Sequence, residues 1–297
     1  MGNALNVDIP KSIERFESLI NKILPKKIFF KLLLRGKGLE FDSYRSFSLD
    51  EDASSIDWKA SVRANTLLAK QYIEERDLKI MFLVDVSENM VFGSQEKLKC
   101  EYSTELVSAL SNTMINAGDK IGFMLFSNKI ISMSFPNGGK KQFEIFVSNL
   151  VDSNSYGGSS DIRMCIESAQ NIIHKDTSLV IIVSDFLRVD GSYIRTFEEI
   201  GAMYETIALI VRDPLDNTLP DLNKEIVIED PETREKLIIN PMIAKNTYEQ
   251  FSKKQLETLK NILIKSNIDF LELSTAEDFV LNLATFLKRR VDEKKRG

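Results

Sequence analysis

The sequence is poor in residue types on which many metal and catalytic sites depend. Its 297 residues include one histidine, His174, and two cysteines, Cys100 and Cys165. A Ser-His-Asp triad or a histidine-rich zinc site would have to use His174, and no nucleophile motif lies near it. We expect His174 to lie at the carboxyl end of a helix, where a partly positive ring is favourable. Both cysteines lie in helix-like sequence, which predicts buried apolar side chains.

Long hydrophobic runs and an excess of basic charge are also missing. No stretch approaches the roughly 20 apolar residues that cross a bilayer, and the longest candidate, residues 28–34, is short and contains Lys31. The formal net charge of -5 gives no reason to expect nucleic acid as the main partner. No signal peptide is visible, so the sequence predicts a cytoplasmic protein without a transmembrane segment.

From Leu78 onward, short apolar runs alternate with helical patterns. Runs typical of buried strands occur at residues 78–84, 121–126 and 179–183, and further strand-like runs occur at 206–211 and 268–273. Helical patterns occur at about 95–117, 140–149, 162–174, 192–201, 248–266 and 276–293. A tight connection joins residues 121–126 to a further run at 130–135, which predicts antiparallel pairing. The sequence therefore predicts an α/β fold, a doubly wound and mostly parallel sheet with one antiparallel edge strand.

Three regions are expected along the chain. Residues 1–35 form an N-terminal helical extension with an amphipathic helix over residues 8–24. Residues 78–297 form the α/β domain, with a small hairpin between Val227 and residues 237–239. Between them, residues 36–77 hold several aromatic side chains but too little apolar sequence to build a separate core. We therefore expect residues 36–77 to pack on the sheet.

Oxygen-bearing side chains follow the first buried run. The run ends at Asp85, and Ser87 and Asn89 follow at alternate positions, giving the pattern D-x-S-x-N. In open α/β sheets, ligands bind at the carboxyl ends of the strands. Hard oxygen donors suit Mg²⁺, Mn²⁺ or Ca²⁺ and suit zinc poorly. The alternative interpretation is a strand end with a turn, where Asp, Ser and Asn are common because they form local hydrogen bonds.

Two other loops carry oxygen donors to the same edge of the predicted sheet. Asp185 directly follows the run at 179–183 and Ser184, and a glycine loop, Gly157-Gly158-Ser159-Ser160, precedes a helix. Oxygen ligands from three loops, completed by water, suit a hard octahedral cation. Glycine lets a backbone approach such a site closely, although the same loop could cradle a phosphate at the helix start.

The order and spacing of these pieces resemble the von Willebrand factor A domain and its metal-ion-dependent adhesion site. That site has D-x-S-x-S after the first strand, a Thr in a glycine loop, and an Asp after a later strand. The resemblance implies a metal ligand set of Asp85, Ser87, Asn89, Ser160 and Asp185. Asn89 stands where the family has Ser and Ser160 where it has Thr, and Ser159 is the alternative to Ser160. Both replacements keep an oxygen donor, but the longer Asn89 would shift the metal or weaken its binding.

Short segments elsewhere resemble a second, more specific family. They are Gly36-Lys37-Gly38-Leu39-Glu40-Phe41, Tyr44-Arg45, Ile56-Asp57-Trp58-Lys59-Ala60-Ser61, Glu75-Arg76, Phe92-Gly93-Ser94, Gly118-Asp119-Lys120-Ile121-Gly122, Val211-Arg212-Asp213-Pro214-Leu215 and Asp230-Pro231-Glu232-Thr233. Over roughly residues 30–290 the chain resembles the prokaryotic domain-of-unknown-function 58 (DUF58) family. Its members resemble von Willebrand A domains and are typically encoded beside AAA+ ATPases of the MoxR type. The resemblance therefore implies an adaptor or co-chaperone that works with such an ATPase.

Two functions are compatible with these motifs. In the first, the chain is a metal-dependent protein-interaction module, and a partner's Asp or Glu completes the metal shell. In the alternative, it is a metal-dependent phosphohydrolase or phosphotransfer domain with Asp85 as nucleophile or metal ligand. D-x-S lacks a second acid two residues on, and no lysine is evident at a strand end to neutralise a phosphate. Residues 138–141 lack the glycine spacing and the Ser or Thr of a Walker A loop, so the first function is favoured.

Overall fold

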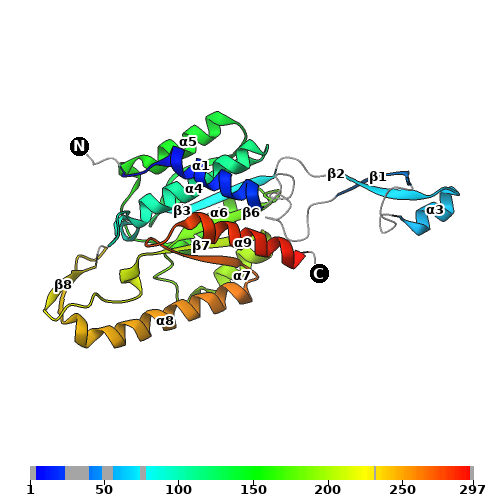
Figure 1. Ribbon diagram of the computed structural model, residues 1–297. Coiled ribbons are helices and arrows are strands. Elements are labelled where there is room, and N and C mark those ends of the chain that lie inside the picture. Colours follow the sequence, from blue (N-terminus) through cyan, green and yellow to red (C-terminus); the bar gives the residue numbers. More distant parts are fainter. Residues whose placement is uncertain (1–4, 24–39, 49–55, 74–77, 231, 295–297) are drawn as a thin grey trace.

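The computed structural model describes residues 5–23, 40–48, 56–73, 78–230 and 232–294. A sheet of six strands lies at its centre (Figure 1). In chain order the strands are β3 (Lys79–Asp85), β4 (Lys120–Phe126), β5 (Ile130–Asn137), β6 (Leu179–Ser184), β7 (Thr206–Arg212) and β10 (Asp269–Ser274). Across the sheet their order is β10-β7-β6-β3-β4-β5. All neighbouring strands are parallel except β4 and β5, which confirms the predicted fold class and its antiparallel edge strand.

Helices cover both faces of this sheet, as the alternation of strands and helices predicted (Figure 1). One face carries α1 (Ile9–Ile23), α4 (Lys99–Asn116), α5 (Lys140–Val151) and α9 (Phe279–Lys294). The other carries α6 (Ile162–Ile172), α7 (Ile194–Met203) and α8 (Pro241–Lys265). The central strand β3 serves both cores, because successive side chains of a strand point to opposite faces. Phe82 and Val84 lie in the first core, and Met81 and Leu83 lie in the second.

The predicted N-terminal helix is confirmed as α1 and belongs to the main body. Its buried residues Phe16 and Ile20 lie in the core shared with α4 and α9. Residues 24–35 of the predicted extension lie outside the described residues, as do the segments at 36–39 and 75–76 that supported the family resemblance. Within the described part of the chain, no helix is both long and apolar enough to cross a membrane.

The described part of residues 36–77 differs from the prediction that this segment packs on the sheet. Strands β1 (Glu40–Ser46) and β2 (Leu68–Ile73) pair with each other. A short helix, α3 (Trp58–Ala64), lies between them in the sequence, and just before it Ile56 forms an isolated bridge with Ala69. Figure 1 shows this unit to one side of the six-stranded sheet, not on either face of it. The aromatic side chain of Trp58 does not enter a core, because it remains 63% exposed. Further backbone hydrogen bonds within the unit run from Phe47 N–H to Leu67 O and from Asp57 N–H to Leu68 O.

A second small hairpin lies near the start of α8 and confirms the predicted pairing. It consists of β8 (Ile226–Glu229) and β9 (Lys236–Ile239), which are antiparallel, and it is called the β8–β9 hairpin below. His174 follows the end of α6, as predicted, where its ring contacts Phe135. Cys100 and Cys165 are buried free thiols, also as predicted.

Candidate functional site

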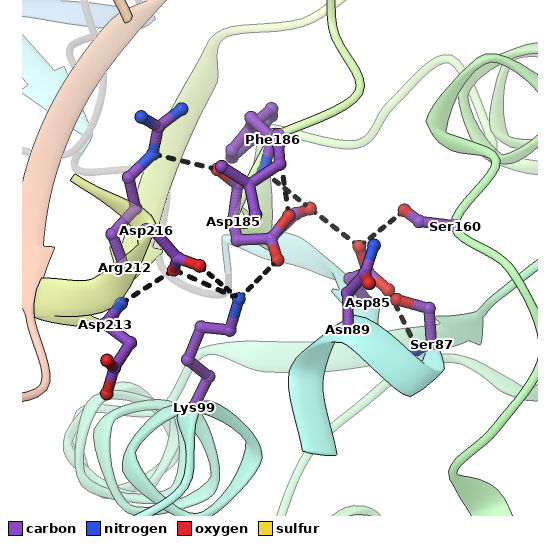
Figure 2. A network of polar contacts seen from close by, with 12 residues as sticks. Asp85, Ser87, Asn89, Lys99, Ser160, Asp185, Phe186, Arg212, Asp213 and Asp216 are labelled. Atoms are coloured by element: carbon purple, nitrogen blue, oxygen red, sulfur yellow. Dashed lines mark hydrogen bonds and ion pairs between the residues drawn. The ribbon is translucent and has the colours of Figure 1, made fainter. Parts of the chain in front are cut away.

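The centre of the candidate site is Asp85, the last residue of β3. The register pairs Val84 of β3 with Val183 of β6, so the next residues along each strand, Asp85 and Ser184, lie side by side. The Asp85 side chain is 1% exposed and accepts three hydrogen bonds. Its Oδ1 accepts from the backbone N–H of Ser87 at 2.9 Å, and its Oδ2 accepts from the hydroxyls of Ser160 at 2.8 Å and Ser184 at 2.7 Å. These bonds fix the orientation of the carboxylate (Figure 2).

The loop after β3 presents two of the other predicted ligands. Ser87 is fully buried, and its hydroxyl oxygen lacks a hydrogen-bond partner among the described residues. Asn89 lies in a 3-10 helix, Glu88–Val91, and its side-chain amide is also buried. An unsatisfied buried hydroxyl costs free energy unless another group pairs with it. Ser87 is therefore a buried oxygen donor available to a further ligand.

The glycine loop approaches Asp85 closely, as its composition predicted. Gly157 and Gly158 have φ values of 136° and 79°, a region that non-glycine residues rarely adopt. Two backbone hydrogen bonds, each 2.9 Å long, join them to the loop after β3: Gly157 N–H donates to Val86 O, and Glu88 N–H donates to Gly158 O. This contact places Ser160 against Asp85, whereas the Ser159 side chain is exposed. The geometry favours Ser160 over Ser159 as the residue of this loop that serves the site.

Asp185 lies beside Asp85 but is already paired with a lysine. Nζ of Lys99, the first residue of α4, is 2.7 Å from Asp185 Oδ2 and 3.1 Å from Asp216 Oδ2. All three side chains are buried. Figure 2 shows the Lys99 ammonium next to the carboxylates of Asp185 and Asp216. Burial lowers the pKa of Lys99, but the two carboxylates raise it by more, so its pKa lies above the ordinary value and the ammonium is retained. The sequence analysis found no lysine at a strand end to neutralise a phosphate, and Lys99 reaches these carboxylates from the start of α4.

The loop that carries Asp185 is held by two further side chains. Arg212, at the end of β7, donates from Nε to the backbone carbonyl of Asp185 at 3.3 Å and from Nη2 to Gln255 Oε1 at 2.5 Å. Gln255 on α8 in turn donates to the backbone carbonyl of Phe186 at 2.8 Å. Phe186 has a φ of 53°, an uncommon conformation for a bulky residue. These contacts fix the backbone of the Asp185 loop in one conformation.

A fourth carboxylate, Glu232 of the β8–β9 hairpin, reaches the site from the outside. Its Oε1 accepts from Asn89 Nδ2 at 2.7 Å and from the backbone N–H of Ser160 at 2.9 Å. Its Oε2 lies 2.7 Å from Nη2 of Arg188. The side chain of Glu232 is only 5% exposed. Glu232 therefore contacts two of the predicted metal ligands.

The charges around the site leave Asp85 without a counter-ion. Lys99 pairs with Asp185, and Arg188 pairs with Glu232, but Asp85 forms no ion pair with any described residue. Burial raises the pKa of Asp85, and the nearby negative charge of Asp185 raises it further. A buried carboxylate of this kind is stabilised either by a proton or by a cation.

The donor set fits a hard cation better than it fits zinc. Within the described residues, no group of three or more His, Cys, Asp or Glu side chains could hold a metal by itself. A metal at Asp85 would need the hydroxyls of Ser87 and Ser160, with water, to complete its shell. Hydroxyl, carboxylate and amide oxygens are the donors that Mg²⁺, Mn²⁺ and Ca²⁺ accept. The residues present fit such an ion.

The same geometry does not favour Asp85 as a catalytic nucleophile. Both carboxylate oxygens already accept hydrogen bonds, and the side chain is almost inaccessible. Lys99 is buried against two carboxylates and cannot neutralise a bound phosphate without leaving them. Phosphoryl transfer needs an accessible nucleophile and free positive charge.

Sequence reasoning found the strand-end residues and missed their partners. Ser184 could have been found, because it precedes Asp185 and ends β6 next to the end of β3. Glu232 lies in the segment Asp230-Pro231-Glu232-Thr233, whose resemblance to a family was visible but whose contact with the site was not. Lys99 carries no signal in the sequence, because a lysine at the start of a helix is ordinarily a solvated residue.

A family comparison identifies the chain. A family model described as "Protein of unknown function DUF58" matches residues 43–259. The chain belongs to the DUF58 family. The match covers the β1–β2 unit from residue 43 and most of the α/β domain, including every residue of the candidate site. The family resemblance predicted from the sequence is confirmed.

Individual relatives and solved structures share only low sequence identity with this chain. Uncharacterized proteins of Mycobacterium bovis and Mycobacterium tuberculosis are 23% identical over 203 residues, which is 68% of this chain and 63% of each relative. The match thus spans less than two thirds of their length. BatB from Bacteroides thetaiotaomicron is 12% identical, with 74% of this chain and 100% of that chain aligned at a TM-score of 0.45. The SpRpn10 VWA domain is 13% identical, with 72% of this chain and 93% of that chain aligned at a TM-score of 0.42.

Proposed function

We propose that this DUF58 protein is a metal-ion-dependent protein-interaction module. Its site would bind Mg²⁺, or Mn²⁺ or Ca²⁺, and a carboxylate from a partner protein. One observation carries the proposal: Asp85 is a buried carboxylate without an ion-pair partner among the described residues, beside the unsatisfied hydroxyl of Ser87, at the end of the central strand. Open α/β sheets bind their ligands at this edge.

Each predicted ligand has a distinct role in this proposal. Asp85 would hold the cation directly, and the hydroxyls of Ser87 and Ser160 would supply neutral oxygens. Asn89 lies at the outer side of the site. Asp185, neutralised by Lys99, would act on the cation through water and not as a direct ligand. A cation held by so little negative charge stays electrophilic, and this is the property that would attract a partner's carboxylate.

The surroundings of the site suit contact with a protein. The β8–β9 hairpin, which carries Glu232 to the site, and the start of α8 expose several apolar side chains: Val227, Leu237, Ile238, Met242 and Ile243. Val227 and Ile238 are opposite each other in the hairpin register, so their exposed side chains share one face. Ile243 is 80% exposed, and exposed apolar side chains of this kind suit contact with a protein. The metal would give specificity for a carboxylate, and the apolar side chains would supply buried area.

The proposed partner is an AAA+ ATPase of the MoxR type, with this chain as its cytoplasmic adaptor or co-chaperone. This part of the proposal comes from the DUF58 family membership and not from the geometry of the site. The curated relatives are themselves uncharacterized, so they add no partner.

The test is complex formation between this protein and a purified MoxR-type ATPase in Mg²⁺. Asp85→Asn keeps the size of the side chain, removes its charge and leaves one of its two oxygen acceptors. The ATPase keeps its own Mg²⁺ throughout. We expect the wild type to form the complex and Asp85→Asn to lose it. The matched control is Asp176→Asn, an exposed aspartate at the opposite end of the strands, which should bind normally. Equal binding by wild type and Asp85→Asn would reject a role for this site in the interaction.

A further inference from the structure

We infer that Glu232 is the site's own carboxylate ligand: it takes the position that a partner's carboxylate would occupy, so the β8–β9 hairpin must release Glu232 before a partner can bind. This inference rests on the proposed function and adds to it an internal competitor for the partner. It concerns a residue outside the ligand set predicted from the sequence.

The first support is where the Glu232 carboxylate lies. Its Oε1 accepts hydrogen bonds from Asn89 Nδ2 and from the backbone N–H of Ser160, at 2.7 Å and 2.9 Å. Asn89 and Ser160 come from two different loops of the candidate site, so Glu232 bridges these loops. A partner's carboxylate that completes the shell of a cation at Asp85 must approach through the same donors.

The second support is that the hairpin turn is built to present Glu232. Asp230 Oδ1 accepts from the backbone N–H groups of Glu232 at 2.8 Å and Thr233 at 3.0 Å, which fixes the turn. Arg188 pairs with Glu232 Oε2, and Arg234 pairs with Glu88 of the loop after β3. Both ion pairs tie the hairpin to the site. These contacts hold the turn in a conformation that directs Glu232 to the site.

The third support is electrostatic. Glu232 brings a negative charge toward a site that already contains Asp85 without a counter-ion and Asp185. Like charges in a low-dielectric site repel one another. Arg188 offsets part of this repulsion from outside, and a cation at Asp85 would remove the rest. The cation and the docked hairpin should therefore stabilise each other, as any two groups with a coupling free energy do.

The experiment compares Mn²⁺ affinity in the wild type, Glu232→Gln and Glu235→Gln by isothermal titration. Glu232→Gln keeps an oxygen acceptor for Asn89 and Ser160 but removes the charge. Glu235 is exposed on the same turn and serves as the matched control. We expect Glu232→Gln to weaken Mn²⁺ binding by about tenfold or more, as loss of a supporting ligand does, and Glu235→Gln to leave it unchanged. Equal affinity in all three proteins would overturn the inference.

Two further measurements separate a ligand from a purely structural residue. The amide hydrogen-exchange rates of the wild-type hairpin, residues 226–239, should fall when Mn²⁺ is added. Rates that do not change with Mn²⁺ would contradict the coupling. At saturating Mn²⁺, the methyl resonance of acetate should broaden more with Glu232→Gln than with wild type, because the internal carboxylate no longer competes. Equal broadening would show that Glu232 does not occupy the partner's position.

The outcomes also distinguish this inference from the proposed function. If the wild type binds no Mn²⁺, the proposed function fails and this inference fails with it. If the wild type binds Mn²⁺, Asp85→Asn does not, and Glu232→Gln binds as the wild type does, the metal site stands and only the role of Glu232 is rejected.

Discussion

Replacing Lys99 by methionine tests how the charges behind the site are balanced. Lys99 Nζ lies 2.7 Å from Asp185 Oδ2 and 3.1 Å from Asp216 Oδ2, and all three side chains are buried. At an effective dielectric constant near 20, these distances correspond to attractions of about 6 and about 5 kcal/mol. The desolvation of the buried ammonium offsets several kcal/mol of this attraction. Lys99→Met removes the cation but leaves both carboxylates buried, and we expect it to lower the free energy of unfolding by about 3–5 kcal/mol.

The assay is equilibrium unfolding in urea followed by circular dichroism. For a chain of this size, the expected loss corresponds to a fall in melting temperature of about 6–10 °C, at roughly 2 °C per kcal/mol. The control is Lys253→Met on the exposed side of α8, which should change stability by less than about 0.5 kcal/mol. In the double variant Lys99→Met/Asp216→Asn, part of the loss should be recovered, because one unpaired charge is removed. A loss below about 1 kcal/mol for Lys99→Met would refute this account of the buried ion pairs.

Two other predictions concern single side chains near the site. Asn89→Ser should retain or tighten Mg²⁺ binding, since it restores the hydroxyl of the von Willebrand pattern, whereas Asn89→Leu should weaken it. Equal affinities for wild type and Asn89→Leu, measured by titration calorimetry, would exclude the side chain as a ligand. Burial raises the pKa of Asp213, but hydrogen bonds from Ser94, Leu215 and Thr275 lower it by more, so its net pKa lies below the ordinary value. The folded protein therefore gains stability from ionised Asp213 above about pH 4 and loses it as the pH falls through the lowered pKa. Urea unfolding of Asp213→Asn should show a constant deficit from pH 5 to about pH 8 that narrows below about pH 4, and a deficit that does not vary with pH would contradict this assignment.

The fold was largely predictable because its signals are local. The parallel strands β3, β4, β6 and β7 are short apolar runs buried on both faces, and the covering helices carry apolar residues at helical spacing, so the period of the sequence identifies both. The antiparallel strand β5 was predictable because only three residues separate it from β4. Residues 36–77 were misjudged, because their aromatic side chains were assumed to need a core. The described part instead forms its own hairpin and leaves Trp58 exposed.

The candidate site was predictable only to the extent that it is made of strand ends. Asp85 and Asp185 lie at one edge because the neighbouring parallel strands β3 and β6 end there, a rule that holds without coordinates. Lys99 and Glu232 reach the site from a helix and from a separate hairpin, and their approach depends on how those elements pack. Neither residue lies at a spacing that predicts the contact. The result is a site whose strand-end side chains were predicted but whose charge balance was not.

The most direct test of the account is thermal unfolding of the wild type and Asp85→Asn as Mg²⁺ is raised. A ligand that binds only the folded state stabilises it by about 2.7 kcal/mol at a concentration 100-fold above its Kd. We predict that the melting temperature of the wild type rises by about 5 °C under that condition, at roughly 2 °C per kcal/mol, and that Asp85→Asn does not respond. A wild-type melting temperature that does not change in millimolar Mg²⁺ or Mn²⁺, or an equal rise in Asp85→Asn, would contradict a metal site at Asp85.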